Sequence, residues 1–283
     1  MPKTRQKGRQ RLKLAIVSNQ STKSKRIMTQ LEEKLLSAGL EIDQNDPDVV
    51  LTVGGDGTLL SAFHRYLHLI DKVRFVGIHT GHLGFYTDWR DYEVDQLVRS
   101  LQNDEGTSVS YPLLDVMLSY SDSKADKQFL ALNEATLRDF SKTMVVDVYI
   151  KNDFFERFRG DGLSVSTPTG STAYSKSLGG AVIHPRLNAI QLNEIASINN
   201  RVYRTLGSPL IISGHEWIRI DIKNGGNYHL NIDHLTIPQS KLKSIMFSVS
   251  RKKIHFASYR HTPFWRRVND AFIGEFPKKE QDD

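Results

Sequence analysis

The sequence predicts an α/β domain followed by an all-β domain, and two observations support this. Up to about residue 110, apolar strand-like runs alternate with segments whose apolar residues recur at helical spacing. That pattern is typical of a parallel, Rossmann-like sheet. After residue 110, short strand-like runs follow one another between turn residues, as in an antiparallel β-sandwich. The 283 residues of the chain are enough for two domains of ordinary size.

The α/β domain is expected to span residues 12–110. Its predicted strands and helices alternate along the chain, which places ligands beyond the carboxyl ends of the strands. Gly39 stands where it would cap the first helix. The predicted strands are Leu12–Val17, Val49–Val53 and Val73–Ile78, and the predicted helices are Lys25–Ala38, a segment from Leu59 to Ile70, and Asp91–Leu101.

The β-rich domain is expected to span residues 111–259. One helix is predicted to interrupt its strands, near Asn188–Ala196. The predicted strands are Leu113–Tyr120, Gln128–Leu137, Thr143–Ile150, Phe154–Phe158, Leu163–Thr167, Trp217–Ile222, Tyr228–Ile232 and Ile245–Val249.

Two terminal segments flank these domains. Residues 1–11 are rich in Lys and Arg and contain no acidic residue, which predicts a flexible, solvated tail; the alternative is a docking arm. Residues 260–283 carry Phe264, Trp265 and Phe272 at near-helical spacing. Because these side chains are too apolar to be left in water, we expect the segment to pack back on another domain or across a subunit interface.

Composition excludes several classes of protein. With no Cys, the chain has no disulfides, no Cys-ligated metal and no thiol nucleophile. No apolar run approaches the roughly 18 residues of a membrane span, and the amino terminus does not read as a signal peptide. The net charge of +6 is concentrated in the tail, and no nucleic-acid-binding signature accompanies it. We therefore expect a cytoplasmic enzyme or binding protein without nucleic-acid or membrane partners.

The stretch VVLTVGGDGTLLSAF, residues 49–63, interrupts an apolar strand with the loop Gly54–Thr58. It is no P-loop, because no Lys follows, and Leu60 stands where a dinucleotide fingerprint needs its third Gly. The glycines let backbone N–H groups approach a phosphate, and Thr58 is placed to cap a helix that favours an anion. Asp56 suits a general base for an acceptor hydroxyl. It suits an Asx turn within its own loop equally well.

Two further stretches carry polar residues in unusual places. In TPTGSTAYSKSLGG, residues 167–180, Tyr174 is suited to stack on adenine while hydroxyls supply donors and acceptors; the alternative is a plain polar turn. ALNEATL, residues 131–137, sets Asn133 and Glu134 inside an otherwise apolar strand. Unpaired burial costs about 1–3 kcal/mol each, so these side chains should face a ligand or a solvated sheet edge.

Taken together, GGDGT at 54–58, NE at 133–134 and TPTGSTAYSKSLGG at 167–180 resemble the NAD kinases in order and spacing. The resemblance extends from about Leu12 to the FWRRV segment. The GGDGT loop by itself also resembles those of diacylglycerol kinases, sphingosine kinases and 6-phosphofructokinases.

The resemblance implies an active site between the two domains of a homotetramer. It implies phosphoryl transfer from ATP, or from inorganic polyphosphate, to the adenosine 2′-hydroxyl of NAD. Mg²⁺ or another divalent cation would be held mainly by the phosphate donor. Asp56 would be the base, the backbone of Gly54, Gly55, Gly57 and Thr58 would serve the donor, and Asn133 and Glu134 would hold the ribose or the metal-bound donor.

The resemblance also implies an NAD pocket. Arg159 and Asp161 would lie near the nicotinamide end, across the subunit interface. Many members carry Gln in the stretch that reads Asn231-Ile232-Asp233-His234 here, and His234 would reach the NAD diphosphate in a pH-dependent manner. The adenine pocket would be lined by Phe85, Thr169, Thr172, Ala173, Tyr174, Ser175, Lys176, Ser177 and Ala196.

Two alternative functions fit parts of the sequence. A lipid kinase of the diacylglycerol type shares GGDGT, but the second domain has no obvious pocket for a lipid chain. A non-catalytic NAD-sensing protein would use the basic tail on nucleic acid, yet a sensor needs no base at Asp56. An assay for NADP formation from NAD and ATP with Mg²⁺ distinguishes the NAD kinase from the lipid kinase and the sensor.

Overall fold

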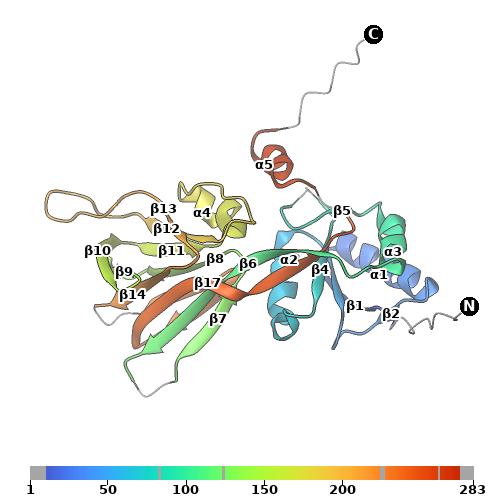
Figure 1. Ribbon diagram of the computed structural model, residues 1–283, viewed down its shortest axis with the longest axis horizontal. Helices are drawn as coiled ribbons and strands as arrows, with labels where there is room; N and C mark the ends of the chain where they lie inside the picture. Colours follow the sequence, from blue (N-terminus) through green and yellow to red (C-terminus); the bar gives the residue numbers. More distant parts are fainter. Residues whose placement is uncertain (1–10, 82–83, 123–124, 224–226, 261, 275–283) are drawn as a thin grey trace, which may run out of the picture. The chain divides into compact units, whose positions relative to one another are not determined.

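The computed structural model describes residues 11–81, 84–122, 125–223, 227–260 and 262–274. Most of the predicted basic tail, and the C-terminal segment beyond Gly274, lie outside these residues. The chain divides into two compact units: unit 1 is the chain up to Val109 together with the part from His255 onward, and unit 2 is Ser110–Ile254. Strands β6 (Ser108–Tyr120) and β17 (Leu242–Ala257) carry the chain from one unit into the other (Figure 1).

Unit 1 is built on a parallel sheet, as predicted. Its strands run in the order β2 (Glu41–Ile42), β1 (Lys13–Ser18), β3 (Val49–Val53) and β4 (Arg74–His79), and β5 (Trp89–Arg90) pairs with β4. Every residue of β3 is buried, as expected for a strand covered on both faces. The helices of this unit are α1 (Thr22–Ser37), α2 (Asp56–Arg65), α3 (Val94–Gln102) and α5 (Phe264–Phe272).

The ends of these helices follow local hydrogen bonds. Helix α1 begins three residues earlier than predicted because the Ser21 side chain accepts a hydrogen bond from the Ser24 N–H. It ends at Ser37, one residue before the predicted end, and Gly39 follows with a φ of +75° in the left-handed region. Helix α2 ends at Arg65, and a separate 3₁₀ helix, Leu67–Leu69, follows where one continuous helix was predicted.

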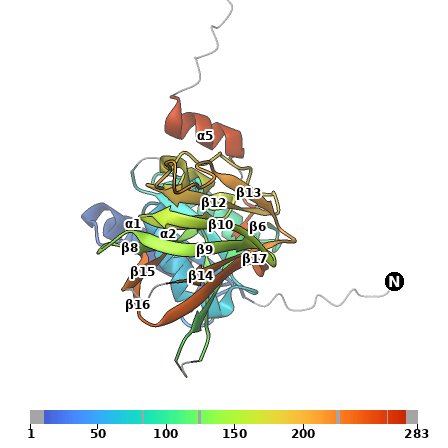
Figure 2. The same cartoon turned by 90° about the vertical axis from the view of Figure 1, so that its left-hand side faces the viewer.

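Unit 2 is an antiparallel β-sandwich, as predicted (Figure 2). Apolar side chains from both sheets form one core. One sheet contains β10 (Asp153–Gly160), β9 (Met144–Ile150), β14 (Trp217–Ile222) and β17, with β6 and β7 (Lys127–Ala131) beside them. The other has the order β13 (Leu210–Ser213), β12 (Ala189–Ile195), β11 (Gly162–Ser166), β8 (Glu134–Asp139), β15 (Tyr228–Ile232) and β16 (Leu235–Gln239).

The predicted helix near Asn188–Ala196 is wrong, because this segment forms strand β12. The apolar side chains of Ile190 and Leu192 alternate with those of Gln191 and Asn193 and enter the sandwich core. The side chains of Gln191 and Asn193 point the other way and donate hydrogen bonds to the Ser175 hydroxyl. The apolar side chains therefore recur at every second residue, which is the spacing of a strand and not of a helix.

The predicted single strand Gln128–Leu137 is also wrong, because it is divided between two sheets. Its first part is β7 and its second part begins β8 at Glu134. At the break, the Asp233 carboxylate accepts hydrogen bonds from the backbone N–H groups of Leu132 and Asn133, at 3.0 and 2.7 Å. A distant side chain thus replaces the strand partners that a continuous ladder would supply.

Within the described residues, no helix has both the length and the apolar character needed to cross a membrane.

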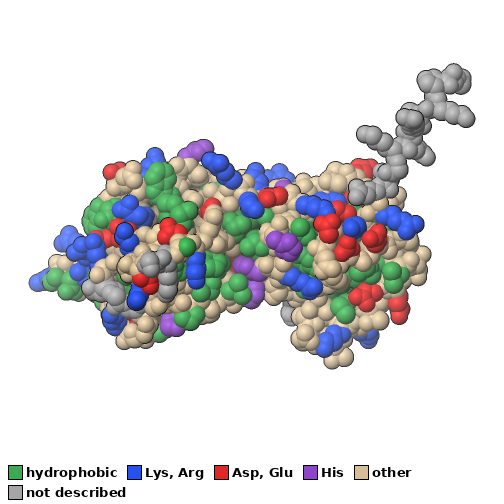
Figure 3. Space-filling view, turned by 90° about the horizontal axis from the view of Figure 1, so that it is seen from below, with side chains coloured by type: hydrophobic (Ala, Val, Ile, Leu, Met, Phe, Trp, Pro, Cys, Tyr) green, Lys and Arg blue, Asp and Glu red, His purple; other side chains and the backbone are tan. Residues whose placement is uncertain are grey.

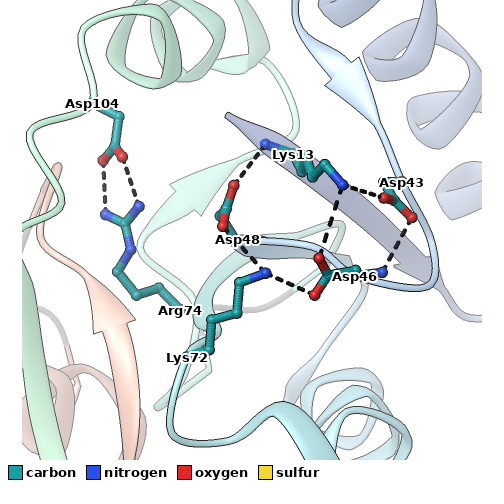
Figure 4. Close-up of polar contacts among 7 residues, drawn as sticks. All are labelled: Lys13, Asp43, Asp46, Asp48, Lys72, Arg74 and Asp104. Atoms are coloured by element: carbon teal, nitrogen blue, oxygen red, sulfur yellow. Dashed lines mark hydrogen bonds and ion pairs between the residues drawn. The ribbon is translucent and has the colours of Figure 1, made fainter. Parts of the chain in front are cut away.

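A largely buried ion pair ties the start of β4 to another segment of unit 1 (Figure 4). The Arg74 guanidinium donates to both carboxylate oxygens of Asp104, at 2.7 and 2.6 Å, and each side chain is 11% exposed. The Tyr259 hydroxyl also donates to Asp104, at 2.8 Å. The bidentate pair holds the pKa of Asp104 below its ordinary value against the opposing effect of burial.

We expect Asp104→Asn to lower the free energy of unfolding by about 2–3 kcal/mol, because it leaves a largely buried guanidinium without its charged partner. Urea denaturation of the parent and variant measures this difference. Asp46→Asn is the matched control (Figure 4). Asp46 is more than half exposed and pairs with exposed Lys72, and an ion pair on the surface contributes little to stability. Equal effects of the two substitutions would contradict the assignment.

Candidate functional site

The loop after β3 leads directly into a helix. Helix α2 begins at Asp56 with Gly55 at its N-cap position and no side-chain cap. The prediction that Thr58 caps this helix is therefore wrong: Thr58 lies inside the first turn, and its N–H donates to the Gly55 carbonyl at 2.9 Å. A Cβ atom on Gly54 would collide with the Thr58 side chain. The loop thus presents the amino terminus of a helix, which favours an anion.

The Asp56 side chain binds a second loop rather than its own. Its two carboxylate oxygens accept hydrogen bonds from the backbone N–H groups of Phe85 and Tyr86, at 2.9 and 3.1 Å. A Cβ atom on Gly84 would collide with the same carboxylate, so a glycine is needed there. The Asx-turn interpretation of Asp56 is therefore wrong. A half-buried carboxylate fixed by two N–H donors keeps a lone pair on each oxygen for a further hydrogen bond.

Phe85 lies in this second loop. Its ring packs on helix α5, with ring centroids 6.4 Å from Phe264 and 5.6 Å from Phe272. The structure therefore brings Phe85 to Asp56 through its backbone N–H. Its ring has apolar neighbours in the same unit.

Asn133 and Glu134 lie in a polar cluster of unit 2, at the break between β7 and β8. Asn133 is buried, which excludes a solvated sheet edge for it. Asp233 lies in the β15–β16 turn with a φ of +52°, and it binds this segment through both its side chain and its backbone N–H. Its carboxylate accepts the N–H groups already described, and its own N–H donates to the Glu134 carbonyl at 3.0 Å.

The Glu134 carboxyl has an unusual environment. Burial, and then the negative charge of Asp233, raise the pKa of Glu134 to about 8, although a hydrogen bond from the Tyr174 N–H opposes this. Its Oε2 atom is buried without a hydrogen-bond partner in the described part of the chain. A carboxyl that keeps its proton near neutral pH can both donate and accept, which suits a sugar hydroxyl.

Glu134→Gln should change how stability depends on pH. Because the pKa of Glu134 rises from 4.5 to about 8 on folding, the folded protein binds the extra proton between these values. Its free energy of unfolding therefore falls as the pH rises through this window. Gln carries no such proton, so between about pH 5 and pH 9 the free energy of unfolding of the variant should rise relative to that of the parent by roughly 4 kcal/mol. Thermal melts across that range would contradict the assignment if the difference stayed constant.

The TPTGST stretch packs directly on Asn133. The Thr167 hydroxyl donates to the Leu132 carbonyl at 2.6 Å and accepts the Gly170 N–H at 2.9 Å. A Cβ atom on Gly170 would collide with the Asn133 backbone. The Thr169 hydroxyl is buried and has no partner in the described part of the chain. This stretch and the NE pair, 34 residues apart at Asn133 and Thr167, therefore form one local site.

The short helix α4 (Tyr174–Ser177) follows this stretch. Thr172, Ala173 and Tyr174 are half-buried, whereas Lys176 and Ser177 are exposed. Ser175 is buried, and its hydroxyl accepts hydrogen bonds from Gln191 and Asn193 at 2.7 and 2.8 Å. Ser175 therefore anchors the helix on β12, which is a structural role in addition to the predicted one.

Arg159, Asp161 and Ala196 meet where β10 and β12 end. The Asp161 N–H donates to the carbonyl of Ile195, next to Ala196, at 2.9 Å. The Arg159 guanidinium lies over the Tyr203 ring, 4.0 Å from its centroid. Ala196 has a φ of +47°, and both it and Asp161 are exposed. His234 is exposed and follows Asp233 in the turn.

Asp233 was not singled out from the sequence. Its role depends on contacts that span 100 residues, and the only local signal in the sequence is an acidic residue in a turn.

Within the described residues, no group of three or more His, Asp or Glu side chains is placed to hold a metal ion. Acidic and basic side chains are interspersed on the face shown in Figure 3.

Comparison with protein families gives two matches. Residues 4–106 match the model of the ATP-NAD kinase N-terminal domain. Residues 132–259 match the model of the ATP-NAD kinase C-terminal domain.

Similar sequences and structures carry related names. The chain is 57% identical over 264 residues to a NAD kinase of Enterococcus faecalis, covering 93% of this chain and 100% of that protein. It is 60% identical over 263 residues to a NAD kinase of Levilactobacillus brevis, covering 93% and 98%. Its fold is similar to that of yeast NADH kinase complexed with NADH, with a TM-score of 0.77, 22% identity and coverage of 95% and 90%. It is also similar to a NAD kinase from Archaeoglobus fulgidus in complex with ATP, with a TM-score of 0.69, 23% identity and coverage of 92% and 97%.

Proposed function

The chain belongs to the ATP-NAD kinase family, and on that premise we propose that it transfers the terminal phosphoryl group of ATP to the adenosine 2′-hydroxyl of NAD. The products are NADP and ADP. The observation that carries the proposal is the Asp56 carboxylate, which two backbone N–H groups fix at the amino terminus of helix α2. This pairs a proton acceptor with a backbone suited to phosphate.

In this mechanism Asp56 is the general base. It orients the 2′-hydroxyl and takes its proton as the oxygen attacks the γ-phosphorus, and the bond to ADP breaks. The N–H groups of Phe85 and Tyr86 hold the carboxylate in place, so its geometry is set before NAD arrives. The loop Gly54–Thr58 faces the donor phosphates with backbone N–H groups, without a P-loop lysine.

ATP is proposed to enter with Mg²⁺ as a combined substrate. Mg²⁺ keeps several waters and commonly binds through phosphates with one or two carboxylates, so it needs no cage of protein ligands. The charge of the donor is then shared between the cation and the helix amino terminus. Inorganic polyphosphate is the alternative donor.

NAD is proposed to bind to the polar cluster of unit 2. Asn133 and the protonated Glu134 suit the ribose hydroxyls. Tyr174 suits the adenine ring, with the unpaired Thr169 hydroxyl nearby in sequence as a further hydrogen-bonding group. Arg159, Asp161 and Ala196 suit the nicotinamide end, and His234 the diphosphate. We further propose a homotetramer in the cytoplasm.

A panel of acceptors tests the proposal. We expect the purified protein to phosphorylate NAD with Mg²⁺ and ATP, and diacylglycerol to remain unmodified in a parallel assay. Phosphorylation of diacylglycerol alone would favour the lipid kinase. NAD binding without turnover would favour the sensor.

Tyr174→Ala should weaken NAD binding much more than it slows turnover at saturation. The loss of a stacking partner costs roughly 1–3 kcal/mol by analogy with base–aromatic stacking. Steady-state kinetics at varied NAD should therefore show a raised KM with a nearly constant kcat. Tyr92→Ala is a matched control, because Tyr92 is an exposed tyrosine of unit 1 that is not proposed to contact NAD. An unchanged KM for Tyr174→Ala would remove this residue from the pocket.

A further inference from the structure

We propose that Arg267, in the C-terminal helix α5, is a positioning residue that holds the Gly84–Asp88 loop in the conformation that binds Asp56. This inference rests on the proposed role of Asp56. Arg267 itself contacts neither the Asp56 carboxylate nor any group proposed to bind NAD, among the contacts that the structure records.

Arg267 is buried, with only 6% of its surface exposed. Its guanidinium donates to the backbone carbonyls of Gly84 and Thr87, at 3.0 and 2.8 Å. It also pairs with the Asp88 carboxylate and approaches the Thr262 carbonyl at 3.4 Å. A buried cation is costly unless its N–H groups are paired, so these contacts fix both the side chain and the loop that it binds.

The contacts of Arg267 bracket the two residues that bind Asp56. Phe85 and Tyr86 donate their N–H groups to the carboxylate, and the carbonyls on either side, those of Gly84 and Thr87, accept from the guanidinium. One short segment of backbone is therefore held by a cation through its carbonyls and by an anion through its N–H groups. This segment cannot shift without breaking its hydrogen bonds to both Arg267 and Asp56.

Two other contacts stabilise the same segment. The Gly84 N–H donates to the Thr87 hydroxyl at 3.2 Å. The Phe85 ring packs on Phe264 and Phe272, at the two ends of helix α5. The helix therefore holds this loop through a polar contact and an apolar one, and the sequence segment FWRRVNDAF supplies both.

The consequence for the reaction follows from geometry. A general base must lie within hydrogen-bond reach of the proton that it takes, and a displacement of about 1 Å can cost on the order of 10²-fold in rate. If Arg267 is replaced, the segment loses its carbonyl contacts and the Asp56 carboxylate loses its fixed position. We expect kcat to fall by about 10–100-fold, with the KM for NAD changed by less than about threefold.

Arg267→Lys tests the proposal. Lys keeps the charge opposite Asp88 but lacks the planar fork that reaches both carbonyls. Asp88→Asn is the second variant, because it keeps Arg267 and weakens its anchor. Arg266→Lys is the matched control: it makes the same substitution one residue earlier, on an exposed side chain. Thermal melts confirm that each variant is folded at the assay temperature.

A double-mutant cycle with Asp56→Asn separates positioning from general structural damage. If Arg267 acts through Asp56, Arg267→Lys should lower kcat in the parent and have little further effect in Asp56→Asn. An Arg267→Lys variant with the parental kcat would overturn the proposal. Losses that multiply in the double variant, or an equal loss in Arg266→Lys, would do the same. A fully active Asp56→Asn enzyme would instead contradict the proposed role of Asp56, which is a distinguishable outcome.

Discussion

Asp56→Asn should lower kcat by at least about 10²-fold while the protein stays folded. A ribose hydroxyl is a poor nucleophile at neutral pH, and a positioned base typically contributes about 10²–10⁴-fold. Asn has nearly the same shape and can still accept one of the two N–H groups that bind Asp56, but it cannot accept the proton of the 2′-hydroxyl. Some loss of NAD affinity should accompany the loss of rate.

Steady-state rates of NADP formation at saturating NAD and ATP measure this effect, and circular dichroism checks the fold. Asp46→Asn serves as a control carboxylate, since its contacts are to Lys13 and Lys72 on the surface of unit 1. If the Asp56→Asn enzyme kept a kcat within about tenfold of the parent, positioning alone would explain catalysis and Asp56 would not be the base.

Asp233→Ala should lower both stability and NAD affinity. It leaves the N–H groups of Leu132 and Asn133 without their acceptor, at about 1–3 kcal/mol for each buried group. Ala also tolerates the positive φ of this position less well than Asp or Asn. We expect a loss of about 2–4 kcal/mol in the free energy of unfolding and at least about tenfold weaker NAD binding, because Asn133 and Glu134 lose their support.

Asp233→Asn is the matched variant for this prediction. Its side-chain oxygen can still accept one N–H group, and Asn adopts the left-handed conformation readily. It should therefore recover much of the stability that Asp233→Ala loses. It should also lower the pKa of Glu134 toward its ordinary value, since the charge of Asp233 is one cause of the rise. Equal stability and NAD affinity in the parent and Asp233→Ala would contradict the role of Asp233.

Local patterns predicted much of the fold and the position of Asp56 in it. The apolar run of β3, which is buried throughout, and the glycines after it place Asp56 at a strand end from the sequence alone. Spacing alone also located the sandwich strands β9, β10 and β14. In each case the physical cause lies within about ten residues of chain, so a sequence pattern can express it.

The remaining features depend on contacts between distant residues. The division between β7 and β8 depends on Asp233, about 100 residues away. Helix α5 reaches the Gly84–Asp88 loop across 180 residues, through Arg267. Strand β12 was wrongly predicted as a helix, and the partner of its buried polar side chains, Ser175, lies in a different segment of the chain. Tertiary partners decide such positions, and one sequence does not show them.

The product of the reaction tests the central claim most directly. We would incubate the purified protein with NAD, ATP and Mg²⁺ and determine by ³¹P NMR where the new phosphate is attached, with Asp56→Asn in parallel. The account predicts a phosphomonoester on the adenosine 2′-oxygen in the parent reaction, and a strongly reduced amount in the variant. ADP formation with unmodified NAD, or a phosphate at another hydroxyl, would contradict it.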